Sequence, residues 1–178
     1  MRIIAGAWRS RPLVAPAGAA TRPTADRVRE TLFSMLVSRI GSFEGLRVLD
    51  LFAGSGALAL EALSRGAAQA LLVEREPAAR AALEANIRAL GADARLLGGD
   101  ATRLPAAVAP ADLLFLDPPY GSDLWADALM SARDQGWVAP SSWISVETAR
   151  AEAVGLPGFE AVAGRVVGKA RLTLLRPG

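Results

Sequence analysis

The sequence predicts an α/β fold built on a doubly wound, mostly parallel sheet, and two features carry this prediction. From residue 45 onward, short apolar runs alternate with helical stretches, as strands and crossover helices do in a parallel sheet. The apolar run at residues 113–116 stops at the Asp-Pro-Pro-Tyr sequence of residues 117–120. A buried central strand ends in this way, because proline cannot donate to the hydrogen-bond ladder.

The remaining elements are expected at regular intervals along the chain. Apolar runs predict strands, and longer amphipathic stretches predict helices. The last two apolar runs flank Gly168-Lys169 and predict a hairpin that adds an antiparallel edge to the sheet. In chain order we expect strands at 46–52, 70–73, 94–97, 113–116, 143–147, 159–167 and 170–176, and helices through 62–65, at 77–90 and at 124–133.

Residues 1–44 differ from the rest and are expected to form a small N-terminal β/α arm, with residues 45–178 as the main domain. Residues 2–14 are interpreted as short strands joined near Gly6, followed by a Pro/Gly/Ala linker. Thr24 is a good N-cap for the helix that follows. The apolar residues of this helix have helical spacing and form one stripe, which we expect to pack on the main domain: Val28, Leu32, Met35, Leu36 and Ile40.

Composition limits the chemistry available to the chain. Its 178 residues suffice for one domain with a small appendage, and a net charge of +2 makes it no polycation. The absence of cysteine and histidine excludes disulfides, thiolate metal sites and the usual general base. Arginines at positions 2, 9 and 11 interrupt the first apolar residues, so we expect neither a signal peptide nor a membrane helix. We expect a cytoplasmic, monomeric protein without a metal.

A glycine-rich loop between the first strand of the main domain and its helix predicts a nucleotide cofactor site. Glycines at this place let the backbone approach a ligand closely and direct helix N-terminal amides at it. Residues 54–59 satisfy G-x-G-x-x-A, so a nicotinamide cofactor must be considered. Glu74, at the end of the next strand, can bind the two ribose hydroxyls of any adenosine cofactor. Asp50 beside the loop would repel a pyrophosphate but suits a cationic sulfonium, which favours S-adenosylmethionine.

The Asp-Pro-Pro-Tyr sequence suits a flat ring that bears an amino group. Tyr120 can stack on the face of the ring, while the Asp117 carboxylate and the Pro118 carbonyl accept its N–H bonds. The expected position, at the carboxyl edge of a parallel sheet, is where such folds bind ligands. The alternative is a plain turn, closed by Pro118 and Pro119, with its carboxylate in solvent.

The arm carries many arginines and few acidic residues. Up to Glu30 it holds six arginines against two carboxylates, with Trp8 among them. A phosphate-rich partner requires a basic patch of this kind. The alternative is that the arginines form an ordinary solvated face and that Trp8 packs in a local core. Composition alone favours neither interpretation over the other.

Taken together, these segments resemble the RsmD family of bacterial methyltransferases. The resemblance covers nearly the whole chain, including the basic arm, and rests on residues 2–9, 22–33, 50–65, 117–120 and the acidic residues at positions 74 and 100. It implies a class I, Rossmann-like methyltransferase fold that uses S-adenosylmethionine. It also implies methyl transfer to the exocyclic N2 of one guanine in 16S ribosomal RNA.

The resemblance further implies a role for each candidate residue. Glu74 is expected to hold the ribose hydroxyls, and Asp100 to accept from the adenine amino group. The methionine part is expected against Asp50 and the loop residues Phe52, Ala53, Gly54 and Gly56. The segment with Arg22, Thr24 and Arg29 is expected near the methionine carboxylate or the entering nucleotide, two roles that the sequence does not separate. RNA contact is expected from Arg9, Arg11, Arg22, Arg27 and Arg29.

Alternatives to this function remain at the level of sequence. The same Asp-Pro-Pro-Tyr site would also serve an adenine-N6 methyltransferase acting on DNA or RNA. A nicotinamide oxidoreductase or a nucleotide-binding module without catalysis is disfavoured by the strand that ends at Asp117. The sequence does not distinguish free ribosomal RNA from an assembled small-subunit particle as the partner.

Overall fold

A computed structural model describes residues 1–16 and 23–178, with Pro23 and Thr24 described by their backbone alone. The helices are α1 (Pro23–Ile40), α2 (Ala57–Ser64), α3 (Pro77–Leu90) and α4 (Leu124–Asp134). The strands are β1 (Arg47–Asp50), β2 (Gln69–Glu74), β3 (Ala94–Gly98), β4 (Ala111–Leu116), β5 (Val138–Ala149), β6 (Phe159–Val167) and β7 (Ala170–Pro177).

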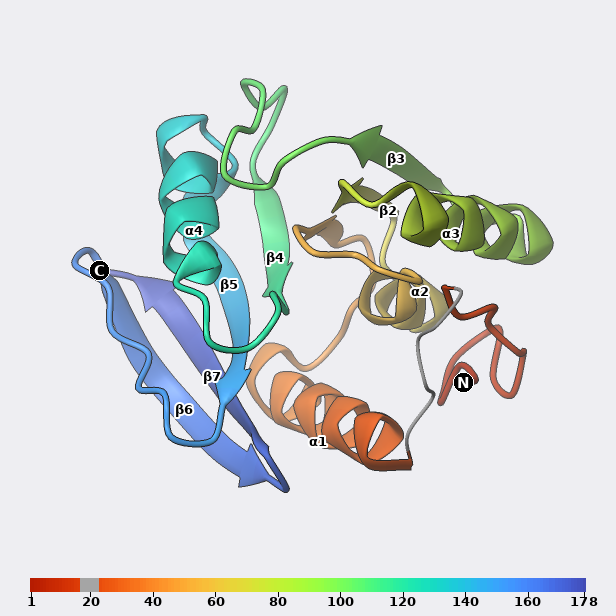
Figure 1. Ribbon diagram of the computed structural model, residues 1–178, viewed down its shortest axis with the longest axis horizontal. Helices are drawn as coiled ribbons and strands as arrows, with labels where there is room; N and C mark the ends of the chain where they lie inside the picture. The colour runs from red at the N-terminus through yellow and green to blue at the C-terminus, as the bar shows by residue number, and fades with distance from the viewer. Residues whose placement is uncertain (17–22) are drawn as a thin grey trace.

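The seven strands form one sheet in the order β3-β2-β1-β4-β5-β7-β6 (Figure 1). Strands β1 to β5 pair in parallel, whereas β7 pairs antiparallel with both β5 and β6. The predicted doubly wound parallel sheet with an antiparallel C-terminal hairpin is therefore confirmed.

Alternate residues of the central strands face opposite sides of the sheet, as the two-residue period of a strand requires. Val48 and Phe115 face a core shared with α1, α2 and α3. Leu49 and Leu116 face a second core, which α4 covers from the other side. The molecule thus has three layers, and the central strands are buried on both faces (Figure 1).

Helix α1 carries the predicted apolar stripe. Val28, Leu32 and Leu36 are buried in the first core, and Met35 and Ile40 pack against it, so this prediction is confirmed. Phe33 is also fully buried, with its ring centroid 5.9 Å from that of Phe115 on β4. The helix begins at Pro23, so Thr24, the predicted N-cap, is instead the second residue of the helix by backbone.

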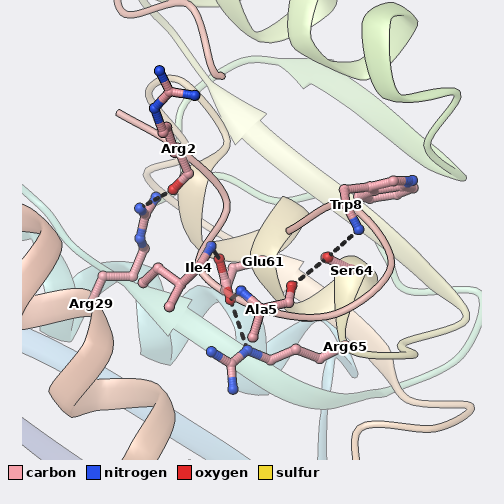
Figure 2. A network of polar contacts seen from close by, with 8 residues as sticks. All are labelled: Arg2, Ile4, Ala5, Trp8, Arg29, Glu61, Ser64 and Arg65. Carbon is pink, nitrogen blue, oxygen red and sulfur yellow. Dashed lines mark hydrogen bonds and ion pairs between the residues drawn. The ribbon is translucent and has the colours of Figure 1, made fainter. Parts of the chain in front are cut away.

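The prediction of short strands in residues 2–14 was wrong. The described part of this segment contains one isolated bridge, between Arg2 and Pro12, joined by turns. Some of its backbone donors pair within the segment, such as Ile3 with the Arg11 carbonyl, and others pair with side chains of α2. The Glu61 carboxylate, fully buried, accepts the N–H of Ile4 at 2.7 Å and that of Ala5 at 3.0 Å (Figure 2).

Ser64, one turn further along α2, completes this attachment. Its Oγ donates to the Ala5 carbonyl at 2.6 Å and accepts the N–H of Trp8 at 2.9 Å (Figure 2). Gly6 has a φ of +83°, and a Cβ there would lie 1.8 Å from the Ser64 carbonyl oxygen. Only glycine therefore allows the turn to lie this close to the end of α2.

The far end of the segment is held by Asn86 of α3. The Asn86 side chain accepts the N–H of Val14 at 2.8 Å and donates to the Val14 carbonyl at 2.9 Å. The same amide nitrogen donates to the Ser55 carbonyl at 2.9 Å, which ties the segment to the glycine loop. Ile3 and Leu13 are buried in the first core. The division of the chain at residue 44 stays a prediction, because the described residues on both sides share that core.

Within residues 1–16 and 23–178, no helix combines the length and the apolarity that crossing a bilayer requires.

We expect Glu61→Gln to destabilise the fold. An amide offers one acceptor oxygen where the carboxylate offers two, so its NH2 group would face the N–H of Ile4 or Ala5. A buried donor left unpaired costs about 1–3 kcal/mol, and about 1 kcal/mol lowers the Tm of a domain of this size by roughly 2–4 °C. Thermal unfolding followed by circular dichroism checks this. The exposed Glu84 of α3 provides the control Glu84→Gln, and equal Tm values for the two variants would contradict the role given to Glu61.

Candidate active site

The reversal of strand order between β1 and β4 opens a cleft at the carboxyl ends of the parallel strands, where ligands bind in such sheets. The cleft has two adjoining parts, one of about 540 Å³ and one of about 350 Å³. Phe52, Asp117 and Glu147 line both parts. Glu74, Asp100 and Tyr120 line the larger part, and Asp50, Gly54 and Arg29 line the smaller part. The structure thus brings the predicted cofactor and catalytic residues together.

Glu74 at the end of β2 holds the glycine loop in place. Its Oε2 accepts the N–H of Gly54 at 2.8 Å, and its Oε1 accepts the N–H of Glu76 at 2.8 Å. Gly54 has a φ of +55°, and nothing lies within 4 Å of the position that a Cβ would take. The loop is therefore open toward the cleft, and each Glu74 oxygen keeps a lone pair for another donor.

The other residues of the glycine loop take up different positions around the cleft. Ala53 is buried, and its N–H donates to the Val73 carbonyl at 3.1 Å, which fixes the loop to β2. Phe52 is half-buried at the junction of the two parts of the cleft. Gly56 is the N-cap of α2 and lines neither part of the cleft.

Asp50 is buried at the end of β1 beneath the loop. Its Oδ2 accepts the N–H of Ala59 at 3.3 Å, whereas Oδ1 has no partner among the described residues. Burial raises the pKa of Asp50 to about 7, although N–H groups of Ala59 and Phe52 oppose the shift. A buried acceptor without a partner is unfavourable, so this oxygen is suited to a cationic ligand.

Arg29 lies in the same smaller part of the cleft and is 5% exposed. Its Nη2 donates to the Arg2 carbonyl (Figure 2) and, at 3.1 Å, to Asp26 Oδ1. Its Nε and Nη1 are buried and have no partner among the described residues. Burial lowers the pKa of Arg29, but an arginine keeps its charge. The position is poorly suited to an RNA phosphate on the surface and well suited to a small anion inside the cleft.

Asp100 lies on the exposed rim of the larger part. Its Oδ1 accepts both the N–H of Thr102 at 2.9 Å and the hydroxyl of Thr102 at 2.8 Å. These bonds lower the pKa of Asp100 and leave Oδ2 without a hydrogen bond within the described chain. An ionised acceptor is therefore held at the rim.

The Asp-Pro-Pro-Tyr segment leaves β4 and forms the side of the cleft opposite the loop. The Asp117 side chain opens onto the cleft; desolvation, Glu147 and Asp50 together raise its pKa. Pro118 is buried, and the Pro119 carbonyl accepts the Ser122 hydroxyl at 2.7 Å. Tyr120 is 49% exposed, which leaves its ring accessible.

Glu147 of β5 is a site residue that the sequence interpretation missed. Its Oε1 accepts the Tyr120 hydroxyl at 2.5 Å, and it lines both parts of the cleft. Desolvation raises the pKa of Glu147, whereas the bond from Tyr120 lowers it. The sequence contains a pattern that could have indicated Glu147, because this residue follows a buried strand segment as Glu74 and Asp117 do.

Three of the arginines predicted to contact RNA lie away from the cleft. Arg9, Arg11 and Arg27 are exposed and line neither part of the cleft, and Arg11 Nη2 donates to the Ala89 carbonyl at 2.8 Å. Arg22 and the side chain of Thr24 lie outside the described residues. In the described part of the chain, no group of three or more acidic side chains is arranged to hold a metal ion.

Comparisons with known proteins agree with this geometry. The family model described as "Conserved hypothetical protein 95" matches residues 1–176. The chain is 43% identical over 150 residues to the ribosomal RNA small subunit methyltransferase D of Escherichia coli K12, covering 83% of this chain and 74% of that protein. It is 36% identical to the Haemophilus influenzae protein of the same name, covering 83% and 78%. The solved structure of the Escherichia coli protein yhhF superposes with a TM-score of 0.84 at 36% identity, covering 99% of this chain and 97% of that one. The chain belongs to the RsmD methyltransferase family.

Proposed function

We propose that this enzyme transfers a methyl group from S-adenosylmethionine to the exocyclic N2 of a guanine in 16S ribosomal RNA. The observation that carries the proposal is the set of unpaired polar atoms in the smaller part of the cleft. Asp50 offers a buried acceptor there, and Arg29 offers two buried donors. An α-amino acid group has an ammonium for the first and a carboxylate for the second. The names of the relatives support a ribosomal RNA substrate.

The other candidate residues fit the rest of this cofactor. Glu74 can accept from the ribose hydroxyls with the lone pairs that the loop amides leave, and Asp100 Oδ2 can accept from the adenine amino group. The open backbone at Gly54 allows close contact with the methionine part. Arg29 is thus assigned to the cofactor carboxylate, and RNA contact is left to Arg9, Arg11, Arg22 and Arg27.

The chain's own residues would position and activate the accepting nitrogen. S-adenosylmethionine supplies an electrophilic methyl group on a positively charged sulfur. The guanine amino nitrogen is a poor nucleophile, because its lone pair is delocalised into the ring. Acceptance of its N–H bonds by Asp117 and the Pro118 carbonyl would localise that lone pair and direct it. Positioning of this kind supplies roughly 7–11 kcal/mol of a barrier, so a histidine base is not required.

Tyr120 would capture the base by stacking, which requires a guanine that has left its helix. A loop of ribosomal RNA, in cytoplasmic small-subunit particles or in free RNA, meets this requirement, and the enzyme would act as a monomer. An adenine-N6 activity is not favoured, because the relatives that cover most of this chain are ribosomal RNA methyltransferases by name.

The test is mass spectrometry of nucleosides from small-subunit RNA incubated with enzyme and S-adenosylmethionine. Formation of N2-methylguanosine supports the proposal, and N6-methyladenosine in its place refutes it.

Two variants should separate the two ends of the cofactor. Glu74→Ala should weaken S-adenosylhomocysteine and 5′-methylthioadenosine alike, because both carry the ribose. Arg29→Met should weaken S-adenosylhomocysteine only, because 5′-methylthioadenosine has no carboxylate. A hydrogen bond to a charged group contributes about 1.5–3 kcal/mol, so each affinity loss should be on the order of tenfold to a hundredfold. Isothermal titration calorimetry measures both ligands, and unchanged affinity in a folded Glu74→Ala variant would remove Glu74 from the site.

Asp117→Ala should abolish most turnover while cofactor affinity stays close to wild type, because Asp117 serves the substrate amino group. Single-turnover methylation and cofactor titration measure the two effects. In the wild type, Asp117 is the stronger hydrogen-bond acceptor when it is ionised, and its pKa is raised. The kcat/KM value should therefore fall as the pH is lowered, and the fall should begin above the range of an ordinary aspartate. Loss of cofactor binding with turnover retained at saturation would contradict these roles.

The double variant Arg9→Ala/Arg11→Ala should weaken RNA binding and leave cofactor binding intact. Replacement of each arginine that touches a phosphate should reduce the slope of log K against log salt concentration by roughly 0.7–0.9. Filter binding across a salt series gives that slope. Deletion of the segment is a poorer test, because it would leave the Glu61 carboxylate buried without Ile4 and Ala5. A wild-type affinity and slope in the double variant would assign both arginines to the solvated surface.

A further inference from the structure

Glu147 lies beside Asp117 because of the register of two parallel strands. Leu116 of β4 pairs with Val146 of β5. Asp117 follows the last residue of β4, and Glu147 is the next residue of β5, which continues to Ala149, so two carboxylates come from adjacent strands near the same edge of the sheet. Each of these two residues lines the larger and the smaller part of the cleft. The methyl-transfer roles described above use Asp117, the Pro118 carbonyl and the Tyr120 ring, and they leave Glu147 without a function.

The two oxygens of Glu147 differ in their surroundings. Oε1 accepts the Tyr120 hydroxyl at 2.5 Å, which fixes both side chains. Oε2 has no hydrogen bond to any described residue, although Glu147 lines the cleft. One carboxylate oxygen thus remains as an acceptor next to the group that is assigned to the substrate amino nitrogen.

Guanine and adenine differ at N1, the ring position next to the amino group. In guanine, the amino group at C2 is beside N1–H, so two neighbouring positions donate hydrogen bonds. In adenine, the amino group at C6 is beside an N1 that only accepts. A carboxylate adjacent to Asp117 would therefore pair with N1–H of guanine and face the lone pair of adenine N1. A site that hydrogen-bonds one substrate rejects an analogue that leaves its polar groups unpaired.

We propose that Glu147 selects guanine by accepting N1–H through Oε2 while Asp117 and the Pro118 carbonyl hold the amino group. This inference rests on the proposed function and adds the residue that distinguishes guanine from other amino-bearing purines. Tyr120 has two functions in this arrangement: its ring stacks on the base, and its hydroxyl orients the selecting carboxylate.

The test compares guanine with 2-aminopurine at the methylated position, which is first mapped with the wild-type enzyme. Ligated RNA carries either base at that position. Both bases bear the amino group, but N1 of 2-aminopurine has no hydrogen. The wild type should strongly prefer guanine in kcat/KM. Glu147→Gln should reduce this preference by on the order of tenfold or more, because its amide N–H can donate to the bare N1.

Matched variants separate recognition of N1–H from the effects of O6 and of the Tyr120 hydroxyl. The loss of O6 in 2-aminopurine affects every variant equally, so only the change in the ratio of kcat/KM values is interpreted. Tyr120→Phe removes the bond to Glu147 and keeps the ring, and it should change the preference less than Glu147→Gln does. Glu160→Gln, on the exposed surface of β6, should leave the preference as in wild type.

Each outcome supports or overturns the role given to Glu147. A wild-type preference in Glu147→Gln, or an equal change in Tyr120→Phe, would overturn the proposal. If Glu147→Gln does not fold, Glu147→Asp gives the same comparison with the charge kept but withdrawn from N1. If both variants lose the fold, as judged by S-adenosylhomocysteine binding, Glu147 is structural and the proposal is wrong. Failure of the wild type to methylate guanine would instead refute the proposed function.

Discussion

The reversal of strand order between β1 and β4 is the constraint on which the other features depend. Because β1 and β4 are paired in parallel at the centre of the sheet, their following segments diverge to opposite faces, toward α2 and α4. The space between them is the cleft. The pairing of β2 with β1 then places Glu74 beside the glycine loop, and the pairing of β5 with β4 places Glu147 beside Asp117. The backbone thus brings Asp50, Glu74, Asp117 and Glu147 to one edge of the sheet, and no contact among their side chains is required.

Much of the fold could be predicted because local signals agreed with the final structure. Helix α3 occupies the predicted residues 77–90, with proline at its start and glycine just past its end. Strand β4 was predictable from a continuous apolar run. The segment before α1 was not, because four of its backbone donors pair with side chains of distant helices, namely Glu61, Ser64 and Asn86. Ile3 and Ile4 favour a strand locally, but no described strand lies beside them to complete a ladder.

The site was predicted wherever a residue's role follows from its place at a strand end. Asp50, Glu74 and Asp117 belong to this group. Glu147 was missed because its partner is Tyr120, and that pairing depends on the register of β5 against β4. The sequence left Arg29 between the cofactor and RNA, although its spacing of four residues from the buried Phe33 places both on one face of α1. Its burial follows from packing that composition does not reveal.

The group of Asp50, Asp117 and Glu147 has a consequence for the order of events in a catalytic cycle. Burial raises the pKa of all three carboxyls, and the other two raise that of Asp117 further, while Arg29 is a charged donor that lines the same space. Their combined field favours a ligand with positive charge on its sulfur over the neutral thioether that remains after methyl transfer. The reaction itself therefore removes part of the attraction that holds the cofactor. In the proposed reaction, discrimination between reactant and spent product would thus come from the electrostatics of the fold itself, before any lid or loop has to move.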